Sequence, residues 1–337
     1  MKIRIVAPIR HFQLAENFEF FIDSIRITNN PVIKNSLYSD QSFISEIGKI
    51  SSDTIKMNHI FYFEGESSEI PFLEGLKNEY QMSRILCGFF DNFISTVWFI
   101  KDGGAHTNTC YVENLENKNY SIGFDNKNVF QNSRDTILSN SSGIFSPVLL
   151  NASECDRLKE IFKNILNVYQ ISVNVDDSIS FKAGVTIPES LNMVDETFNR
   201  MERALLFLKI LRKDGYIISK LTYYMALLES LFTFDNARIR ETVSNRASKF
   251  IGGSNSTIFK NIENIKEAYK IRSNYIHGNI NKKKPNEQID LCKAIDEIVR
   301  QILLKILAND IPELENFSLP NTNENLRKFE KYIQKFN

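Results

Sequence analysis

A helical periodicity in the second half of the sequence is the feature that most restricts its fold. Apolar residues recur at three- and four-residue steps in KLTYYMALLESLF (220–232) and IDEIVRQILLKIL (295–307), so each segment has one apolar face when it is helical. Cap-type residues open a further segment of this kind, ASECDRLKEIFKNIL. Such helices bury their apolar faces against one another, which predicts a helical bundle. The predicted helices span 196–212, 215–234, 238–251, 257–277, 287–308 and 324–335, and a strand-like interlude lies at 169–187.

The first part of the chain has a different pattern. The strand-like runs KIRIVAPI, SIRITNN and HIFYFEGE accompany one strong helical segment at 76–100. Ser, Asn and Gly crowd LSNSSGIFSP (138–147), which is typical of a loop. A chain of 337 residues is long enough for two domains. We therefore predict an α+β protein, with a mixed strand and helix domain over 1–150 and a helical domain over 151–337.

Composition and charge indicate the cellular setting. The 42% of hydrophobic and 24% of charged residues are ordinary for a soluble globular protein. No apolar run is long enough to span a bilayer, and MKIRIVAPIRHF lacks the apolar core of a signal peptide. The cysteines form no C-x-x-C pair, so we expect free thiols. These features predict a cytoplasmic protein without a membrane partner, and a formal net charge of zero gives it no global attraction to nucleic acid.

The segment KDGGAHTNTCY contains the best candidate for a metal site. Asp102, His106 and Cys110 are metal-ligating residue types, but their spacing matches no established set of ligands. The two glycines of the segment favour a turn instead. We therefore predict neither a metal nor a cofactor.

Arg272 stands out because it lies close to the apolar face of a predicted helix. Ile258, Ile262, Ile265, Tyr269 and Ile276 form one stripe, and Arg272 lies about 40° from its centre. A guanidinium that is directed toward protein needs a partner, since its desolvation would otherwise cost several kcal/mol. Either a structural carboxylate meets Arg272, or a groove at this place receives anions.

The same helix is predicted to end at His277, five residues after Arg272. Ser273 lies four residues before His277 on its face, close enough to hydrogen-bond the imidazole, and Gly278 is suited to end the helix. A histidine at this place can simply cap the helix, where the dipole favours the imidazolium. Basic residues exceed acidic ones around it, which indicates either a phosphate-binding surface or a solvated loop. The basic residues are Lys260, Lys266, Lys270, Arg272, Lys282, Lys283 and Lys284, against Glu263 and Glu267.

Three motifs in order resemble a known family. MALLESLFT, IRETVSNRASKFIG and AYKIRSNYIHG are similar in order and spacing to the Apea-like branch of the HEPN superfamily, and the third contains Arg-x4-His from Arg272 to His277. The resemblance covers roughly residues 190–308. It implies that the helical domain is an all-α bundle of the HEPN type.

The resemblance also implies an activity, that of a metal-independent endoribonuclease without a cofactor. Arg272 and His277 match the family's catalytic pair, and Ser273 fills the place of a polar helper that is often Asn, Asp or His. Glu229 and Asn274 take supporting places, Glu229 as a partner of Arg272. The RNA-binding residues that we expect beside them are Lys270, Lys282, Lys283 and Lys284.

The chemistry of such an enzyme fits these residue types. Cleaving RNA through its own 2′-hydroxyl needs a base, an acid and positive charge at the phosphorane. One histidine cannot be base and acid at once, so we expect a homodimer that brings two copies of His277 together, as is common in the family. The resemblance further implies a role in anti-phage defence or a toxin-like stress response, with the N-terminal domain as a sensor or regulatory part whose partner is unknown.

Two alternatives remain open at this point. HEPN domains also serve as non-catalytic RNA-binding or protein-interaction modules, in which the arginine stabilises the dimer. Others are toxins that a nucleotidyltransferase modifies at a Tyr two residues after the histidine. Here that position is Asn279, which counts against the toxin variant.

Overall fold

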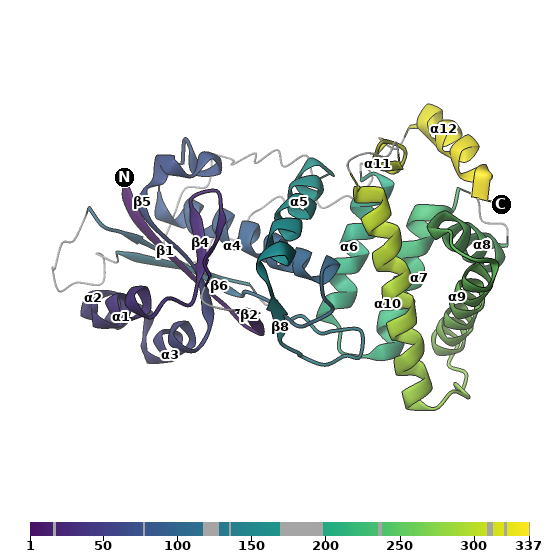
Figure 1. Cartoon of the computed structure of the whole chain (residues 1–337), viewed down its shortest axis with the longest axis horizontal. Helices are drawn as coiled ribbons and strands as arrows, with labels where there is room; N and C mark the ends of the chain where they lie inside the picture. Colours follow the sequence, from purple (N-terminus) through teal and green to yellow (C-terminus); the bar gives the residue numbers. More distant parts are fainter. Residues whose placement is uncertain are drawn as a thin grey trace. The chain divides into compact units, whose positions relative to one another are not determined.

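The computed structural model describes residues 1–15, 18–76, 78–116, 128–134, 136–168, 198–234, 238–308, 313–319 and 322–336. The chain divides into two compact units. The first contains residues 1–162, 209–220 and 284–293, and the second contains 163–208, 221–283 and 294–337. Each is described by itself below, with the element labels of Figure 1.

An antiparallel sheet forms the centre of the first unit (Figure 1). Its strand order is β3-β4-β5-β1-β6-β7, and every neighbouring pair is antiparallel. The strand β1 is buried at every position but its first, because strands flank it on both sides and helices cover both faces of the sheet. The strands are β1 (Lys2–Ile9), β3 (Phe20–Ile22), β4 (Ile25–Thr28), β5 (His59–Glu66), β6 (Thr109–Asn114) and β7 (Val129–Ser133).

Side-chain alternation along β1 and β5 builds a core on each face of this sheet. On one face Val6, Ile60 and Tyr111 pack with apolar residues of three short helices, α1 (Pro31–Ser39), α2 (Gln41–Ile47) and α3 (Lys49–Met57). On the other face Phe61 stacks on Phe90 of α4 (Glu79–Thr96), with ring centroids 4.1 Å apart. The sheet is therefore the middle layer of three.

The strands β2 and β8 form a second, two-stranded sheet, separate from the first. The short strands β2 (Phe12–Leu14) and β8 (Val148–Leu150) pair in parallel, and α5 (Ala152–Val168) follows β8.

The α4 helix begins at Glu79 because the Asn78 side chain accepts a hydrogen bond from the Gln81 N–H at 2.9 Å. Single 3-10 turns occupy Ser67–Glu69, Pro71–Leu73, Val97–Phe99 and Gln334–Phe336.

The rest of the described chain is helical. Aromatic rings from four of the helices and the final turn pack edge to face in the second unit, around Phe232, Phe250 and Phe317. The helices are α6 (Arg200–Lys213), α7 (Ile217–Phe232), α8 (Ile239–Ile251), α9 (Asn255–Ile276), α10 (Pro285–Leu307), α11 (Glu313–Phe317) and α12 (Asn323–Ile333).

The predicted α+β class is confirmed by this architecture. The predicted strands match β1, β4 and β5, while the predicted interlude at 169–187 lies outside the described residues. The division into domains over 1–150 and 151–337 stays a prediction. Among the helices of the described segments, none combines the length and apolar character that crossing a membrane requires.

Candidate functional site

The α9 helix carries Arg272 and ends next to His277. It begins after Ser254, whose hydroxyl accepts a hydrogen bond from the Thr257 N–H at 3.2 Å. It stops because His277 leaves the helical conformation and Gly278 has a φ of 69°. The backbone N–H of His277 donates to the carbonyl of Ser273 at 3.1 Å.

The apolar stripe of α9 is shorter than the sequence predicted. Ile265 and Tyr269 are buried, but Ile258 and Ile262 are only half-buried. Ile276 was predicted to continue the stripe, and this is wrong, because its side chain is 56% exposed. The neighbouring Tyr275 and Ile280 are exposed as well, so the buried part of α9 ends before its last turn.

Arg272 is half-buried and forms an ion pair with Glu229 of α7. Its charged carbon lies 6.0 Å from the centre of the Tyr269 ring. Its Nε atom is buried and has no hydrogen-bond partner among the described residues. The guanidinium is therefore held on one side by a carboxylate and an aromatic face, while part of its hydrogen-bonding capacity remains unused.

Tyr269 completes the environment of this ion pair. The side chain is buried one turn before Arg272. Burial raises the pKa of Tyr269 well above its ordinary value, and the neighbouring Glu229 carboxylate raises it further. The phenol therefore stays neutral beside the ion pair of Glu229 and Arg272.

His277 and Ser273 are both exposed. The hydrogen bond between them is a backbone one, and no side-chain hydrogen bond from Ser273 to the imidazole is present within the described segments. The Arg272 side chain contacts Glu229 of α7, whereas His277 is the exposed residue that caps the C-terminal end of α9. Within one chain, no hydrogen bond or ion pair of the described residues joins the two predicted catalytic side chains.

The other predicted site residues are distributed around the end of α9. Asn274 is half-buried, and its carbonyl accepts the Asn279 N–H at 2.7 Å. Lys270 and Lys282 are exposed, and Lys283 pairs with Glu267 at 3.7 Å. Lys284 is exposed, and its backbone N–H donates to the Glu287 carboxylate at 2.8 Å. The local surplus of positive charge is smaller by one than the sequence indicates, because Glu229 of α7 pairs with Arg272. Glu263 and Glu267, which the sequence count already includes, pair with Lys266 and Lys283.

The three candidate metal ligands of the first unit have other partners. Asp102 forms an ion pair with Arg212 at 2.8 Å, and the His106 Nδ1 atom hydrogen-bonds the carbonyl of Gly104 at 2.8 Å. Burial lowers the pKa of His106 and raises that of the fully buried Cys110. No group of three potential metal-ligating side chains occurs within the described residues.

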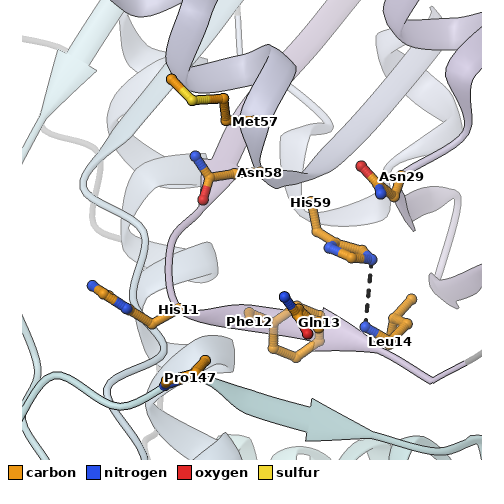
Figure 2. Close-up of a pocket in the computed structure, with 9 residues that line it drawn as sticks. All are labelled: His11, Phe12, Gln13, Leu14, Asn29, Met57, Asn58, His59 and Pro147. Carbon is orange, nitrogen blue, oxygen red and sulfur yellow. Dashed lines mark hydrogen bonds between the residues drawn. The ribbon is translucent and has the colours of Figure 1, made fainter.

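Sequence reasoning missed a polar pocket in the first unit (Figure 2). It has a volume of about 440 Å³ and lies next to β2 and the end of α3. It was missed because four segments far apart in the chain form it. One signal was present, since the first unit contains His11, His59 and His106, three of the four histidines. The lining residues are His11, Phe12, Gln13, Leu14, Asn29, Met57, Asn58, His59 and Pro147.

Comparisons with protein-family models, with curated proteins and with solved structures found no match to this chain.

Proposed function

We propose that the protein is a metal-independent endoribonuclease of the HEPN type, with Arg272 and His277 as its catalytic pair. The observation that supports this proposal best is the position of Arg272, which Glu229 holds in place five residues before an exposed His277. The proposal also rests on the three motifs that resemble the Apea-like branch. It assigns the activity to anti-phage defence or a toxin-like stress response in the cytoplasm.

The proposed reaction is attack of the RNA 2′-hydroxyl on the adjacent phosphate. A His277 imidazole removes the proton of that hydroxyl, and a second imidazole protonates the leaving 5′-oxygen. Arg272 donates N–H groups to the phosphorane, which carries more negative charge than the ground state. Its Nε atom is buried, so the phosphate would contact the other nitrogens of the guanidinium while Glu229 stays bound.

A homodimer supplies the second imidazole in this proposal. Beside His277, the side chains of Tyr275 and Ile276 are each 56% exposed and that of Ile280 is 89% exposed. Large apolar groups that cluster at one helix end are typical of a surface that another molecule covers. A second copy of the chain, packed there about a twofold axis, would bring its own His277 close to the first.

Substitutions at the pair test the activity. We expect His277→Ala to abolish cleavage of single-stranded RNA and to leave folding intact, because His277 is exposed at the helix end. Asn279→Ala, at an exposed site two residues on, is the matched control and should cleave normally. Cleavage should continue in EDTA and yield a 2′,3′-cyclic phosphate. Persistent cleavage by the His277→Ala protein would refute the proposal.

Mixed dimers test the shared site. Dimers with one His277→Ala subunit should have almost no activity if both imidazoles act on one phosphate. Half of the normal activity would instead indicate two independent sites.

A non-catalytic RNA-binding or interaction module is the second candidate function. The observation that favours it is the ion pair itself, because a half-buried Arg272 that contacts Glu229 can stabilise the helical bundle without taking part in catalysis. In that case His277→Ala should not change RNA binding, and no cleavage product should form. Replacing the exposed Lys270 and Lys282 by Ala should flatten the dependence of log affinity on log salt by about 0.7 per lost phosphate contact, whether or not the protein cleaves RNA.

A further inference from the structure

Two residues that line the polar pocket of the first unit, Asn29 and Asn58 (Figure 2), hydrogen-bond a buried lysine. Lys34 of α1 is only 7% exposed. Its Nζ atom donates to the side-chain oxygen of Asn29 and to the carbonyls of Asn58 and Lys56, the latter at 2.9 Å. An ammonium has three N–H donors, so these bonds satisfy all of them. Asn29 and Asn58 in turn line the pocket.

Among the described residues, no carboxylate pairs with Lys34. Its three hydrogen-bond partners are neutral, and none of the pocket-lining residues is acidic. Arg4, a buried cation of the same unit, differs in this respect. It contacts Glu113 at 2.8 Å, Asp40 at 2.9 Å and Glu64 at 3.2 Å. A buried cation without a counter-ion is costly, and a negative group in the adjoining space would lower that cost.

Lys34 also fixes the direction of the Asn29 amide. Since an ammonium can only donate, the atom of Asn29 that it contacts must be the oxygen, and the NH2 group then points elsewhere. That NH2 group makes no hydrogen bond among the described residues, and Asn29 lines the pocket. The amide therefore offers its donors to the pocket and is polarised by the charge behind it.

His59 forms a wall of the pocket without adding charge. Its Nε2 atom lies 3.4 Å from the Leu14 N–H of β2, the bond drawn in Figure 2. Burial and the nearby Lys34 lower the pKa of His59 to about 4, so the ring is neutral at physiological pH. Burial lowers the pKa of Lys34 to about 8, so the ammonium remains mostly protonated there.

His11 and Gln13 add donors at the opposite side. The backbone of His11 is left-handed, with a φ of 53°, a costly conformation for a residue with a side chain. It places the imidazole at the pocket beside the His106 ring, with centroids 5.5 Å apart. Figure 2 shows the Gln13 side chain rising from β2 toward Asn58 and His59. Neither side chain has a hydrogen-bond partner among the described residues.

We propose that this pocket binds a small anionic molecule, whose phosphate or carboxylate group accepts hydrogen bonds from Asn29 and faces the buried charge of Lys34. The volume of about 440 Å³ exceeds that of either anion alone, so the rest of the ligand lies toward His11 and Gln13. This site is independent of the Arg272 and His277 pair and does not rest on the proposed ribonuclease activity.

The test uses an isosteric change of charge. Asn29→Asp places a carboxylate against Lys34 and thus supplies the missing counter-ion within the protein. We expect the variant to have a higher melting temperature than the natural chain and to bind anions at least about tenfold more weakly, the equivalent of 1.4 kcal/mol. Asn35→Asp is the matched control, because it makes the same change at an exposed position of α1 and should alter neither property.

Inorganic phosphate and acetate serve as probes on the full chain, measured by titration calorimetry and by the shift in melting temperature against chloride at equal ionic strength. Binding of phosphate alone identifies a phosphate ester as the ligand type, and binding of acetate alone identifies a carboxylate. Binding of either probe, or of both, supports the proposal if Asn29→Asp weakens it at least about tenfold and Asn35→Asp does not. Binding of neither probe, binding that Asn29→Asp leaves unchanged, or equal loss of binding in both variants overturns the proposal.

Discussion

The ion pair between Arg272 and Glu229 can be tested by a double-mutant cycle. The two side chains are 26% and 24% exposed, so the pair lies between an exposed ion pair, worth at most about 1 kcal/mol, and a fully buried one. Removing one partner of a buried pair costs about 3–5 kcal/mol. We therefore expect Glu229→Gln and Arg272→Met each to lower the free energy of unfolding by about 2 kcal/mol, with a coupling energy of about 1–1.5 kcal/mol.

Urea denaturation of the four proteins of the cycle gives this coupling energy. The matched control is the pair of Arg240 and Glu241 on α8, whose atoms are 2.6 Å apart but whose side chains are 54% and 44% exposed. Its cycle should give less than about 0.5 kcal/mol, because solvent screens the charges. Equal coupling energies in the two cycles would refute the reasoning that partial burial, and not the distance between the charges, makes the Arg272 pair strong.

Three more predictions concern the sheet, Lys34 and the end of α9. Phe90→Ala removes the ring that stacks on Phe61 and should lower the free energy of unfolding by about 3–5 kcal/mol in urea, more than Phe72→Ala at a half-buried site. The pKa of Lys34 is about 8 in the folded protein, against an ordinary value of 10.5, so the unfolded chain binds more protons between these values. Stability relative to a Lys34→Met variant should therefore rise with pH across this window, and parallel pH profiles of the two proteins would contradict it. Finally, Ile276→Asp should convert the proposed dimer to a monomer in sedimentation, while Ile50→Asp, at an 85% exposed site of α3, should leave the association state unchanged.

The long elements of the fold could be predicted because their side-chain patterns are strong. KIRIVAPI became β1 within its predicted bounds, and the predicted helix 257–277 corresponds to α9. The helices α1 to α3 were not predicted, because they have only seven to nine residues and their sequences are largely polar. The Asn30 side chain caps α1 and the Asp40 side chain caps α2, and Phe43 and Ile55 pack against the sheet. These helices thus depend on tertiary contacts that local periodicity does not contain.

The candidate site, too, could be predicted from the sequence only in part. The need of Arg272 for a partner, either a carboxylate or an anion in a groove, followed from its place on the helical wheel, and Glu229 pairs with it in the structure. The exposure of Ile276 could not be predicted, because periodicity indicates which face of a helix is apolar but not how far the covering layer extends. The pocket at His59 could not be predicted from the sequence for a different reason. Its residues come from β2, the end of α3, β5 and the loops beside them, and only the folded unit brings them together.

The place of β1 in the sheet has a consequence for how the protein folds during synthesis. β1 pairs with β5 and β6, which lie at 59–66 and 109–114, much later in the chain. A ribosome that adds about 5–20 residues per second therefore leaves the apolar strand Lys2–Ile9 without partners for seconds. An unpaired strand of this kind can join strands of neighbouring chains, and closing such long loops slows folding. Chaperone binding to nascent chains should therefore be strongest before residue 114 leaves the ribosome exit tunnel and should decline once β6 can pair.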